Sequence, residues 1–392
     1  MDIFEQSLLL HKDLKGKLDV ANKLDIQTRE QLSQVYSPGV AAPCEEIYKD
    51  PGKVYDYTIK ANTIAIVSDG SAVLGLGNIG PLAAIPVMEG KAMLFKKFAG
   101  INGFPICLNT QDTEEIIQIV KNIAPVFGGI NLEDISSPRC FEIEARLQNI
   151  GIPVFHDDQH GTAIVVLAAL MNFCRATGRK MGDLKVVING AGAAGIAIAR
   201  YIARKDPMAI NQQLVKSVIV CDSISIIHSQ RENLNAMKRE LLTYINPDDI
   251  AGSVFDALKG ADVFIGVSKA NLLKEEHIRS MSPDPLILAL ANPIPEILPE
   301  DAYKGGAFIV GTGRSDYNNQ VNNVLAFPGI FLGALQAKAS RINLSMKFAA
   351  AEAIAAHVKE PTKDKIIPDS LDPTVATSVA EAVRSIALTH NF

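Results

Sequence analysis

The sequence predicts an α/β protein of two domains, and three observations support this prediction. Its 392 residues suffice for two domains, since a domain usually spans roughly 100–200 residues. Short apolar runs alternate with helical stretches along the chain, which is typical of α/β proteins. Hydrophobic residues make up 48% and charged residues 21% of the composition, so the chain can bury a large core without disulfide or metal staples.

Composition and charge exclude several classes of protein. The net charge is −5, and no stretch clusters lysine and arginine as a phosphate-binding surface does. The densest apolar run, Ala163 to Cys174, contains Asn172 and is shorter than the roughly 20 residues of a membrane span. The N-terminus lacks the segments of a signal peptide, and five cysteines without Cys-x-x-Cys spacing indicate reduced thiols. We therefore expect a cytoplasmic protein that binds neither nucleic acid nor membrane.

The first half of the chain is expected to form one α/β domain, residues 1–160. Apolar runs that end in polar or acidic residues predict its strands. The expected strands cover residues 64–67, 105–108, 129–132 and 152–155, and the expected helices cover residues 113–122 and 141–148. Residues 92–95 form a further apolar segment. The strongly apolar stretch Gly161–Thr177 predicts a helix that bridges the two domains.

The second half, residues 161–392, is expected to form the other domain. The expected strands cover residues 185–189, 217–221, 262–267, 285–289 and 307–310, with a helix at 195–205. The polar stretch Asp206–Gln213 predicts a long connection between that helix and the next strand. From Phe331 onward the pattern is mostly helical, and we expect these helices to fold back across both domains.

A glycine motif in the second half predicts a dinucleotide site. Gly190-Ala191-Gly192-Ala193-Ala194-Gly195 directly follows an expected strand and opens an expected helix. Gly190 permits a tight turn, Gly192 lets the backbone approach a pyrophosphate, and Gly195 lets helix and strand pack closely. The unpaired N–H groups at the helix N-terminus favour the anion. This context predicts a Rossmann-type, doubly wound parallel sheet that binds NAD, with an ordinary structural glycine turn as the alternative.

The end of the next strand predicts which dinucleotide is preferred. Asp222 can accept hydrogen bonds from the adenosine ribose and would repel the extra phosphate of NADP, so NAD is expected over NADP. Asp222 lies further from the glycines than the usual ~20 residues, which the polar connection explains. The first glycine match, Gly75–Gly80, has no ribose acid after it and is followed by Pro81. We interpret it as a flexible loop that lines a substrate cleft.

Carboxylates cluster at the ends of two expected strands. Glu133 and Asp134 follow one strand, and Asp158, with Asp157 beside it, follows another. Side chains at neighbouring strand ends converge in open α/β sheets, and an all-carboxylate set suits Mg²⁺ or Mn²⁺. The alternative is that these are helix-capping or solvated acids. His156 and His160 flank the pair and receive no role.

The motifs taken together resemble those of the malic enzymes, in order and over nearly the whole chain. In length the chain is similar to the short bacterial form. The residues that carry the resemblance are Val35-Tyr36-Ser37-Pro38-Gly39-Val40-Ala41, Leu74–Gly80, Glu89-Gly90-Lys91, Gly129–Ile135, Phe155–Thr162, Asn189–Gly195, Leu290-Ala291-Asn292-Pro293 and Gln320–Gly329.

This resemblance implies an activity: oxidative decarboxylation of (S)-malate to pyruvate and CO₂ with reduction of NAD, dependent on a divalent metal. It implies that Tyr36 is the general acid and Lys91 the general base, with a lysine pKa lowered by burial and by the adjacent cation. The implied metal ligands are Glu133, Asp134 and Asp158, and the implied positions for malate and the nicotinamide are Asn292, Asn322 and Asn323. It also implies a homodimer in which a neighbouring subunit contributes to each site.

Two alternatives remain, and three positions depart from the family pattern. The alternatives are a malolactic-type conversion of malate to lactate and a catalytically inactive NAD-binding sensor. Val73 stands where a malate-binding arginine is found in the eukaryotic branch, and Asn318 stands where many relatives have proline. Ser223-Ile224-Ser225 lacks a basic-glycine pair, which weakens the expected coenzyme preference.

Overall fold

The first half of the chain forms a four-stranded parallel sheet. The computed structural model describes residues 2–203 and 214–389. The strands are β1 (Thr63–Ser68), β2 (Asn102–Cys107), β3 (Gly129–Leu132) and β4 (Val154–His156), in the order β2-β1-β3-β4. The four predicted strands are confirmed. Val67 pairs with Leu132, and Leu132 with His156, so the carboxyl ends of β1, β3 and β4 finish level at one edge.

Three helices connect these strands: α5 (Gly80–Ala99), α6 (Thr113–Ile123) and α7 (Arg139–Leu147). The apolar segment at residues 92–95 is part of α5, where Met88, Ala92 and Phe95 recur at helical spacing and are buried. In α6 the side chain of Asp112 accepts a hydrogen bond from the first turn, as an N-cap should. The helices predicted at 113–122 and 141–148 are therefore confirmed.

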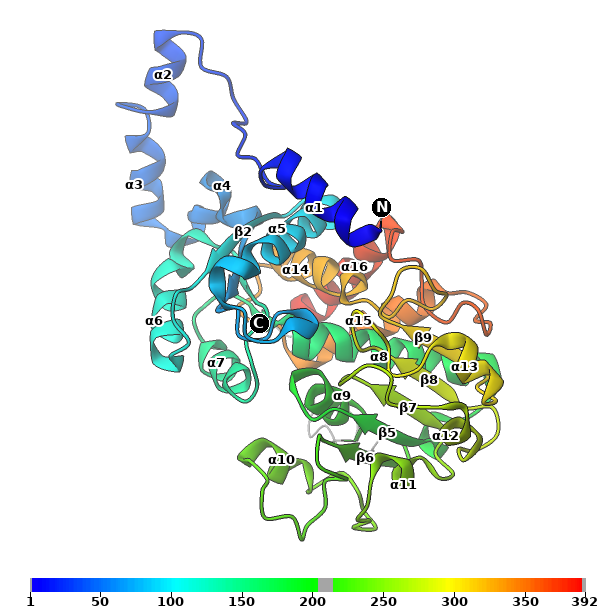
Figure 1. Cartoon of the computed structure of the whole chain (residues 1–392). Helices are drawn as coiled ribbons and strands as arrows, with labels where there is room; N and C mark the ends of the chain where they lie inside the picture. The colour runs from blue at the N-terminus through cyan, green and yellow to red at the C-terminus, as the bar shows by residue number, and fades with distance from the viewer. Residues whose placement is uncertain (1, 204–213, 390–392) are drawn as a thin grey trace.

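Helix α8 (Asp157–Thr177) links the two halves and lies at the centre of the molecule (Figure 1). It begins four residues earlier than predicted, because the side chain of His156 caps it by accepting the backbone N–H of Gln159. Asp157 and Asp158 therefore occupy its first turn. By length and composition α8 is apolar enough to cross a membrane, but most of it is buried inside the molecule, where it packs against α9 (Ala193–Ala203) and α15 (Leu344–His357).

The second half forms a five-stranded parallel sheet in the order β6-β5-β7-β8-β9. Its strands are β5 (Lys185–Asn189), β6 (Ser217–Cys221), β7 (Val263–Gly266), β8 (Leu286–Ala289) and β9 (Ile309–Thr312). The chain moves outward from β5 to β6 and then returns to β7, so the strand order reverses between β5 and β7. Val186 and Ile188 face one apolar core, while Val187 faces another. The predicted doubly wound sheet is confirmed.

Short helices lie in the connections between the strands of this second sheet. They are α10 (Ala236–Leu241), α11 (Val254–Leu258), α12 (Glu275–Arg279) and α13 (Pro299–Lys304). Single 3₁₀ turns lie at Pro51–Lys53, Ile59–Asn62, Leu74–Leu76, Ala124–Val126, Met181–Asp183 and Asn323–Leu325. The polar connection predicted at residues 206–213 lies outside the described residues.

The C-terminal helices return to the first half, as predicted. They are α14 (Phe327–Gln336), α15 and α16 (Pro373–Thr389), and α14 packs against both α5 and α16. The rings of Phe95 and Phe327 lie with centroids 4.6 Å apart. A Cβ atom at Gly333 would stand 2.5 Å from the carbonyl oxygen of Ala380, so glycine is required where α14 and α16 cross.

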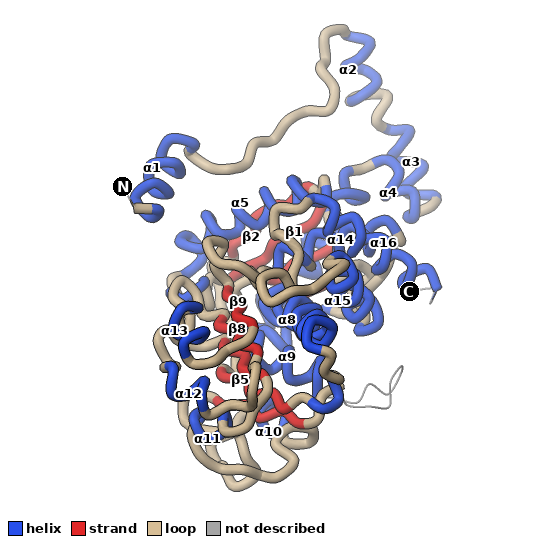
Figure 2. Tube along the Cα trace, turned by 90° about the vertical axis from the view of Figure 1, so that its right-hand side faces the viewer, coloured by secondary structure: helices blue, strands red, loops and turns tan. Residues whose placement is uncertain are grey.

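Residues 2–50 project from this body (Figures 1 and 2). They form α1 (Ile3–Leu14), α2 (Arg29–Val35) and α3 (Ala41–Lys49), followed by the short α4 (Val54–Tyr57). None of these helices contains a buried residue. The backbone N–H of Lys17 donates to Glu89 on α5. We call residues 2–50 the N-terminal arm.

Candidate active site and coenzyme site

Lys91 lies at the centre of the candidate active site. It sits on the buried face of α5, with a side chain that is only 8% exposed. Its Nζ atom is 2.6 Å from Oδ2 of Asp157 and 3.0 Å from Oε1 of Glu133. No role for Asp157 was predicted from the sequence, yet its carboxylate is closer to Nζ of Lys91 than that of Glu133 is. Its signal was its position beside Asp158 at a strand end.

The three predicted metal-ligand candidates lie together beside this lysine. One carboxylate oxygen each from Glu133, Asp134 and Asp158 lies within 4.8 Å of the others. The backbone at Asp134 turns into the left-handed region, with φ 54°, and its N–H donates to Asp158 Oδ2 at 2.8 Å. Glu133 and Asp134 are buried, so these two do not fit the alternative of solvated acids.

The electrostatics of the cluster favour a bound cation. Burial raises the pKa of Asp134 to about 9, helped by the neighbouring Asp158 and Glu133 carboxylates. Burial likewise raises the pKa of Glu133 to about 7 and that of Asp158 to about 6. Oδ2 of Asp134 is buried without a hydrogen-bond partner among the described residues. Such a set of hard oxygen donors fits Mg²⁺ or Mn²⁺.

The expected lowering of the Lys91 pKa is wrong for the chain alone. Burial does lower the pKa, but the carboxylates of Asp157 and Glu133 outweigh burial, and Asp158 adds to them, so the pKa of Lys91 is raised. The physical reason is proximity: an opposite charge within hydrogen-bonding distance stabilises the protonated form.

Of the three predicted asparagines, only Asn323 contacts the residues around Lys91. Asn323 donates from its side chain to Oδ2 of Asp157, whereas Asn322 caps the 3₁₀ turn that follows it. Asn292 follows β8, and a Cβ atom at Gly75 would come 2.4 Å from its carbonyl oxygen. The loop Gly75–Gly80 therefore approaches the segment that follows β8 at the carboxyl edge of the second sheet. Its role as the lining of a substrate cleft stays a prediction.

The structure does not bring Tyr36 to this site. Tyr36 ends α2 in the N-terminal arm, where it is 68% exposed. Both whole-chain views show α2 apart from α5 and the first sheet (Figures 1 and 2).

The predicted coenzyme loop has the geometry that its glycines require. Helix α9 begins at Ala193, inside the motif. Gly190 has φ +124°, and a Cβ atom at Gly195 would stand 1.7 Å from the carbonyl oxygen of Gly190. A Cβ atom at Gly192 would meet nothing within 4 Å, so this position opens to a ligand. The loop lies after β5, at the reversal of strand order where open α/β sheets bind ligands.

Asp222 already has five hydrogen-bond donors. Arg231 makes a bidentate contact at 2.9 Å for each oxygen, and Lys238 donates at 2.7 Å. The backbone N–H groups of Ile224 and Ser225 add two more, although a carboxylate offers only about four lone-pair sites. Burial would raise the pKa of Asp222, but Arg231 and Lys238 hold it well below its usual range. Sequence reasoning missed both cations, because local spacing gives no sign of this contact.

Comparison with known proteins decides the family. The sequence profile of the malic enzyme N-terminal domain matches residues 15–148, and that of the malic enzyme NAD-binding domain matches residues 159–388.

The chain belongs to the malic enzyme family.

Named malic enzymes match it over almost its full length. It is 53% identical to the bifunctional malic/malolactic enzyme of Bacillus subtilis, covering 99% of this chain and 94% of that one. It is 52% identical to the NAD-dependent malic enzyme of Geobacillus stearothermophilus, covering 98% of this chain and 78% of the relative. The crystal structure of the NAD-dependent malic enzyme from Thermotoga maritima superposes with a TM-score of 0.90 at 50% identity, covering 98% and 99% of the two chains.

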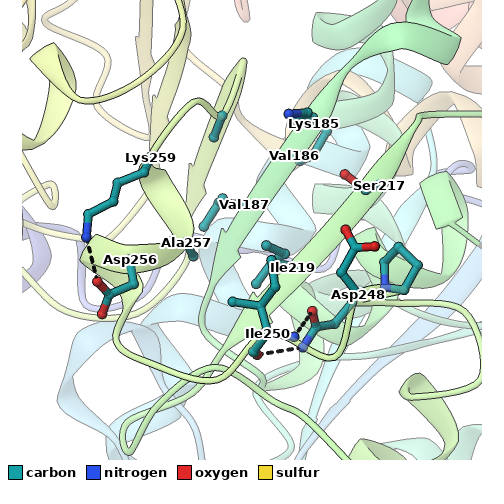
Figure 3. A pocket seen from close by; sticks show the side chains of 13 residues that line it. Lys185, Val186, Val187, Ser217, Ile219, Asp248, Ile250, Asp256, Ala257 and Lys259 are labelled. Atoms are coloured by element: carbon teal, nitrogen blue, oxygen red, sulfur yellow. Dashed lines mark hydrogen bonds and ion pairs between the residues drawn. The ribbon is translucent and has the colours of Figure 1, made fainter.

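A cavity of about 120 Å³ lies away from Lys91 and the carboxylate cluster. It is lined by the first residues of β5 and β6, Lys185 and Ser217 (Figure 3). The glycine loop follows the opposite, carboxyl end of β5. This cavity is therefore not part of the coenzyme site.

Proposed function

We propose that the chain catalyses oxidative decarboxylation of (S)-malate to pyruvate and CO₂ with reduction of NAD, and that it requires Mg²⁺ or Mn²⁺. The observation that carries this proposal is Lys91, buried against Asp157 and Glu133 beside a three-carboxylate cluster. The relatives named NAD-dependent malic enzyme support the same chemistry. We further propose that residues 1–160 hold substrate and metal, that residues 161–392 hold NAD, and that the protein works in the cytoplasm.

The roles of the residues follow from their contacts. Glu133, Asp134 and Asp158 would hold the cation, and Asn292 and Asn323 would contact malate and the nicotinamide end. Asn322 shapes the turn that presents Asn323. A cation held there would supply Lewis-acid chemistry for the C2 oxygen of malate, and a bound NAD would supply the hydride acceptor. Lys91 takes the proton of the C2 hydroxyl group. Asp157, held by Asn323, orients the lysine amine.

Lys91 must be neutral before it can accept this proton. In the chain alone, Asp157 and Glu133 hold its proton in place. Glu133 cannot pair fully with Lys91 and also hold a cation, so occupation of the cluster weakens one of the charges that raise the lysine pKa.

We propose that the general acid reaches each site from a second copy of the chain. Tyr36 protonates C3 after CO₂ has left, but it lies on the N-terminal arm, away from Lys91 of its own chain. The arm exposes apolar side chains that a partner would cover: Ile3, Phe4, Leu8, Leu9, Leu10, Leu14, Leu18, Val20, Leu24, Ile26, Leu32, Val35 and Val40. Exposed apolar surface of this extent is typical of a protein interface. A homodimer fits these observations.

A second function has one specific observation in its favour. The Bacillus subtilis relative, 53% identical, is named a bifunctional malic/malolactic enzyme. Conversion of malate to lactate would use the same metal and dinucleotide but release no NADH. The inactive-sensor alternative has no such support, because Lys91 and the carboxylate cluster are both in place.

One assay tests the proposed function. Purified protein is mixed with malate and Mn²⁺, with NAD or NADP in parallel, and absorbance of the reduced coenzyme is followed. We expect NADH to form, EDTA to stop it, and Asp158→Ala and Lys91→Ala each to lower the rate by about 10²-fold or more. Full activity in EDTA would refute the metal requirement, and lactate formed without NADH would favour the malolactic alternative.

A further inference from the structure

A network of buried polar side chains, formed by Glu144, His160 and Tyr201, lies near the carboxylate cluster. The proposed mechanism does not use this network. Glu144 on α7 accepts a hydrogen bond from Nε2 of His160 on α8 at 2.9 Å and from the backbone N–H of His156 at 3.2 Å. Nδ1 of His160 is 3.1 Å from the hydroxyl group of Tyr201 on α9. This polar network thus joins α7, α8 and α9, and α9 begins at the coenzyme loop.

The contacts of Glu144 and His160 determine where the protons lie in this polar network. Burial alone would raise the pKa of Glu144, but His160, Lys347 and His156 lower it to about 2. Ionised Glu144 can only accept, so Nε2 of His160 carries the proton, and its Nδ1 accepts from Tyr201. Both ring nitrogens of His160 therefore have a hydrogen-bond partner.

His156 lies between this polar network and the proposed metal site. It ends β4 and caps α8, where its Nδ1 accepts the backbone N–H of Gln159 at 3.3 Å. Because Nδ1 accepts, the proton lies on Nε2. That Nε2 atom is buried with no partner at hydrogen-bonding distance among the described residues, and it is 3.8 Å from Oδ2 of Asp158. The backbone of Ile135 also interacts with this ring.

We propose that Glu144 and His156 are positioning residues of the metal site. Glu144 fixes the backbone of His156 and the ring of His160, and so sets the first turn of α8. His156 then directs its Nε2–H toward Asp158 and selects the orientation in which that carboxylate faces Glu133 and Asp134. Residues that contact a metal-ligating side chain usually fix its orientation, and their loss typically lowers metal affinity by 10–100-fold. The inference rests on the proposed metal site.

The test measures Mn²⁺ binding to the purified full chain, with free Mn²⁺ followed by electron paramagnetic resonance. The first variant is His156→Asn, because asparagine still caps a helix but does not reproduce the Nε2–H donor. We expect its Kd for Mn²⁺ to rise about 10-fold or more, with little change in Tm. Glu144→Ala should raise the Kd at least as much, and Glu144→Gln should raise it less, because its carbonyl oxygen can still accept the N–H of His156.

Asn172→Ala is the matched control. Asn172 is buried on the same helix, away from the first turn, and donates to the carbonyl oxygens of Ala355 and Ile366. It should lower Tm without changing the Kd for Mn²⁺. If His156→Asn binds Mn²⁺ as tightly as the parent, or if Glu144→Ala and Asn172→Ala bind it equally well, the positioning roles are wrong. If the parent does not bind Mn²⁺, or if Asp158→Ala binds it as the parent does, the metal site itself is wrong.

Discussion

At the scale of single residues, contacts between distant segments decide what a side chain can do. Lys91 and Asp157 lie 66 positions apart in the sequence, and their Nζ and Oδ2 atoms are 2.6 Å apart in the structure. Asp222 is similar, since its carboxylate is engaged by Arg231 and Lys238 rather than free for a ribose hydroxyl group. The carboxylates were predictable from the strand ends and Lys91 from the family resemblance, but their contact partners were not.

The contacts of Asp222 predict its effect on coenzyme choice. Asp222→Asn removes one negative charge and leaves the positive charges of Arg231 and Lys238 beside the ribose position. We expect the ratio of kcat/KM for NADP to that for NAD to rise about tenfold, equivalent to about 1.4 kcal/mol. Lys238→Met is the control and should move the ratio the other way. If both variants keep the parent ratio, this cluster does not select the coenzyme.

At the scale of elements, the glycine loop shows where sequence reasoning works well. Its three glycine roles depend on local backbone geometry, and the structure has that geometry: Gly190 turns with positive φ, and Gly195 packs against the carbonyl oxygen of Gly190. The start of α8 was harder to predict. The apolar pattern begins only at Gly161, whereas the polar first turn begins at Asp157 and is capped by His156.

Two substitutions separate folding from coenzyme binding in this loop. Gly195→Ala places a Cβ atom against Gly190, so it should lower Tm markedly. Gly192→Ala meets no protein atom within 4 Å and should leave Tm unchanged, while it raises the Kd for NAD because the Cβ atom occupies the path of the pyrophosphate. Thermal unfolding and NAD titration by fluorescence measure both effects. Unchanged NAD affinity in Gly192→Ala would place the pyrophosphate elsewhere.

The carboxylate cluster predicts a pH dependence of metal stabilisation. The pKa values of Glu133 and Asp134 are raised to about 7 and about 9. Between the ordinary carboxyl pKa and these raised values, the folded chain keeps protons that the unfolded chain has lost. The free energy of unfolding therefore falls as pH rises through this range. A cation replaces those protons. The increase in Tm on adding Mn²⁺ to EDTA-treated protein should therefore be larger at about pH 8 than at about pH 6. An increase that is equal at both pH values, or larger at the lower one, would contradict this.

At the scale of the whole molecule, the N-terminal arm is the feature that sequence patterns did not predict. The two sheets, the bridging helix and the returning C-terminal helices follow from hydrophobic periodicity. The arm carries many apolar residues, yet none of its helices contains a buried one. Periodicity shows that a face is apolar but not whether that face packs on its own chain or on a second copy.

Mixing two inactive variants tests the proposed second copy. Tyr36→Phe and Lys91→Ala each remove one group of the same site, and neither homodimer should produce pyruvate at the parent rate. If Tyr36 acts on the partner's site, a mixed dimer contains one complete site. Co-expression with two different affinity tags should then yield a heterodimer with about half of the parent activity. A heterodimer that is as inactive as its parents would show that Tyr36 does not act across the interface.

The central claim is that malate is oxidised and decarboxylated and that the reduced coenzyme is released. The most direct measurement follows ¹³C-labelled malate by NMR in the presence of Mn²⁺ and NAD, with NADH read in the same sample by absorbance. We expect pyruvate, CO₂ and NADH to appear in equal amounts, and none of them in EDTA. Lactate and CO₂ without free NADH, or malate that remains unconverted in the presence of metal and coenzyme, would contradict the proposed function.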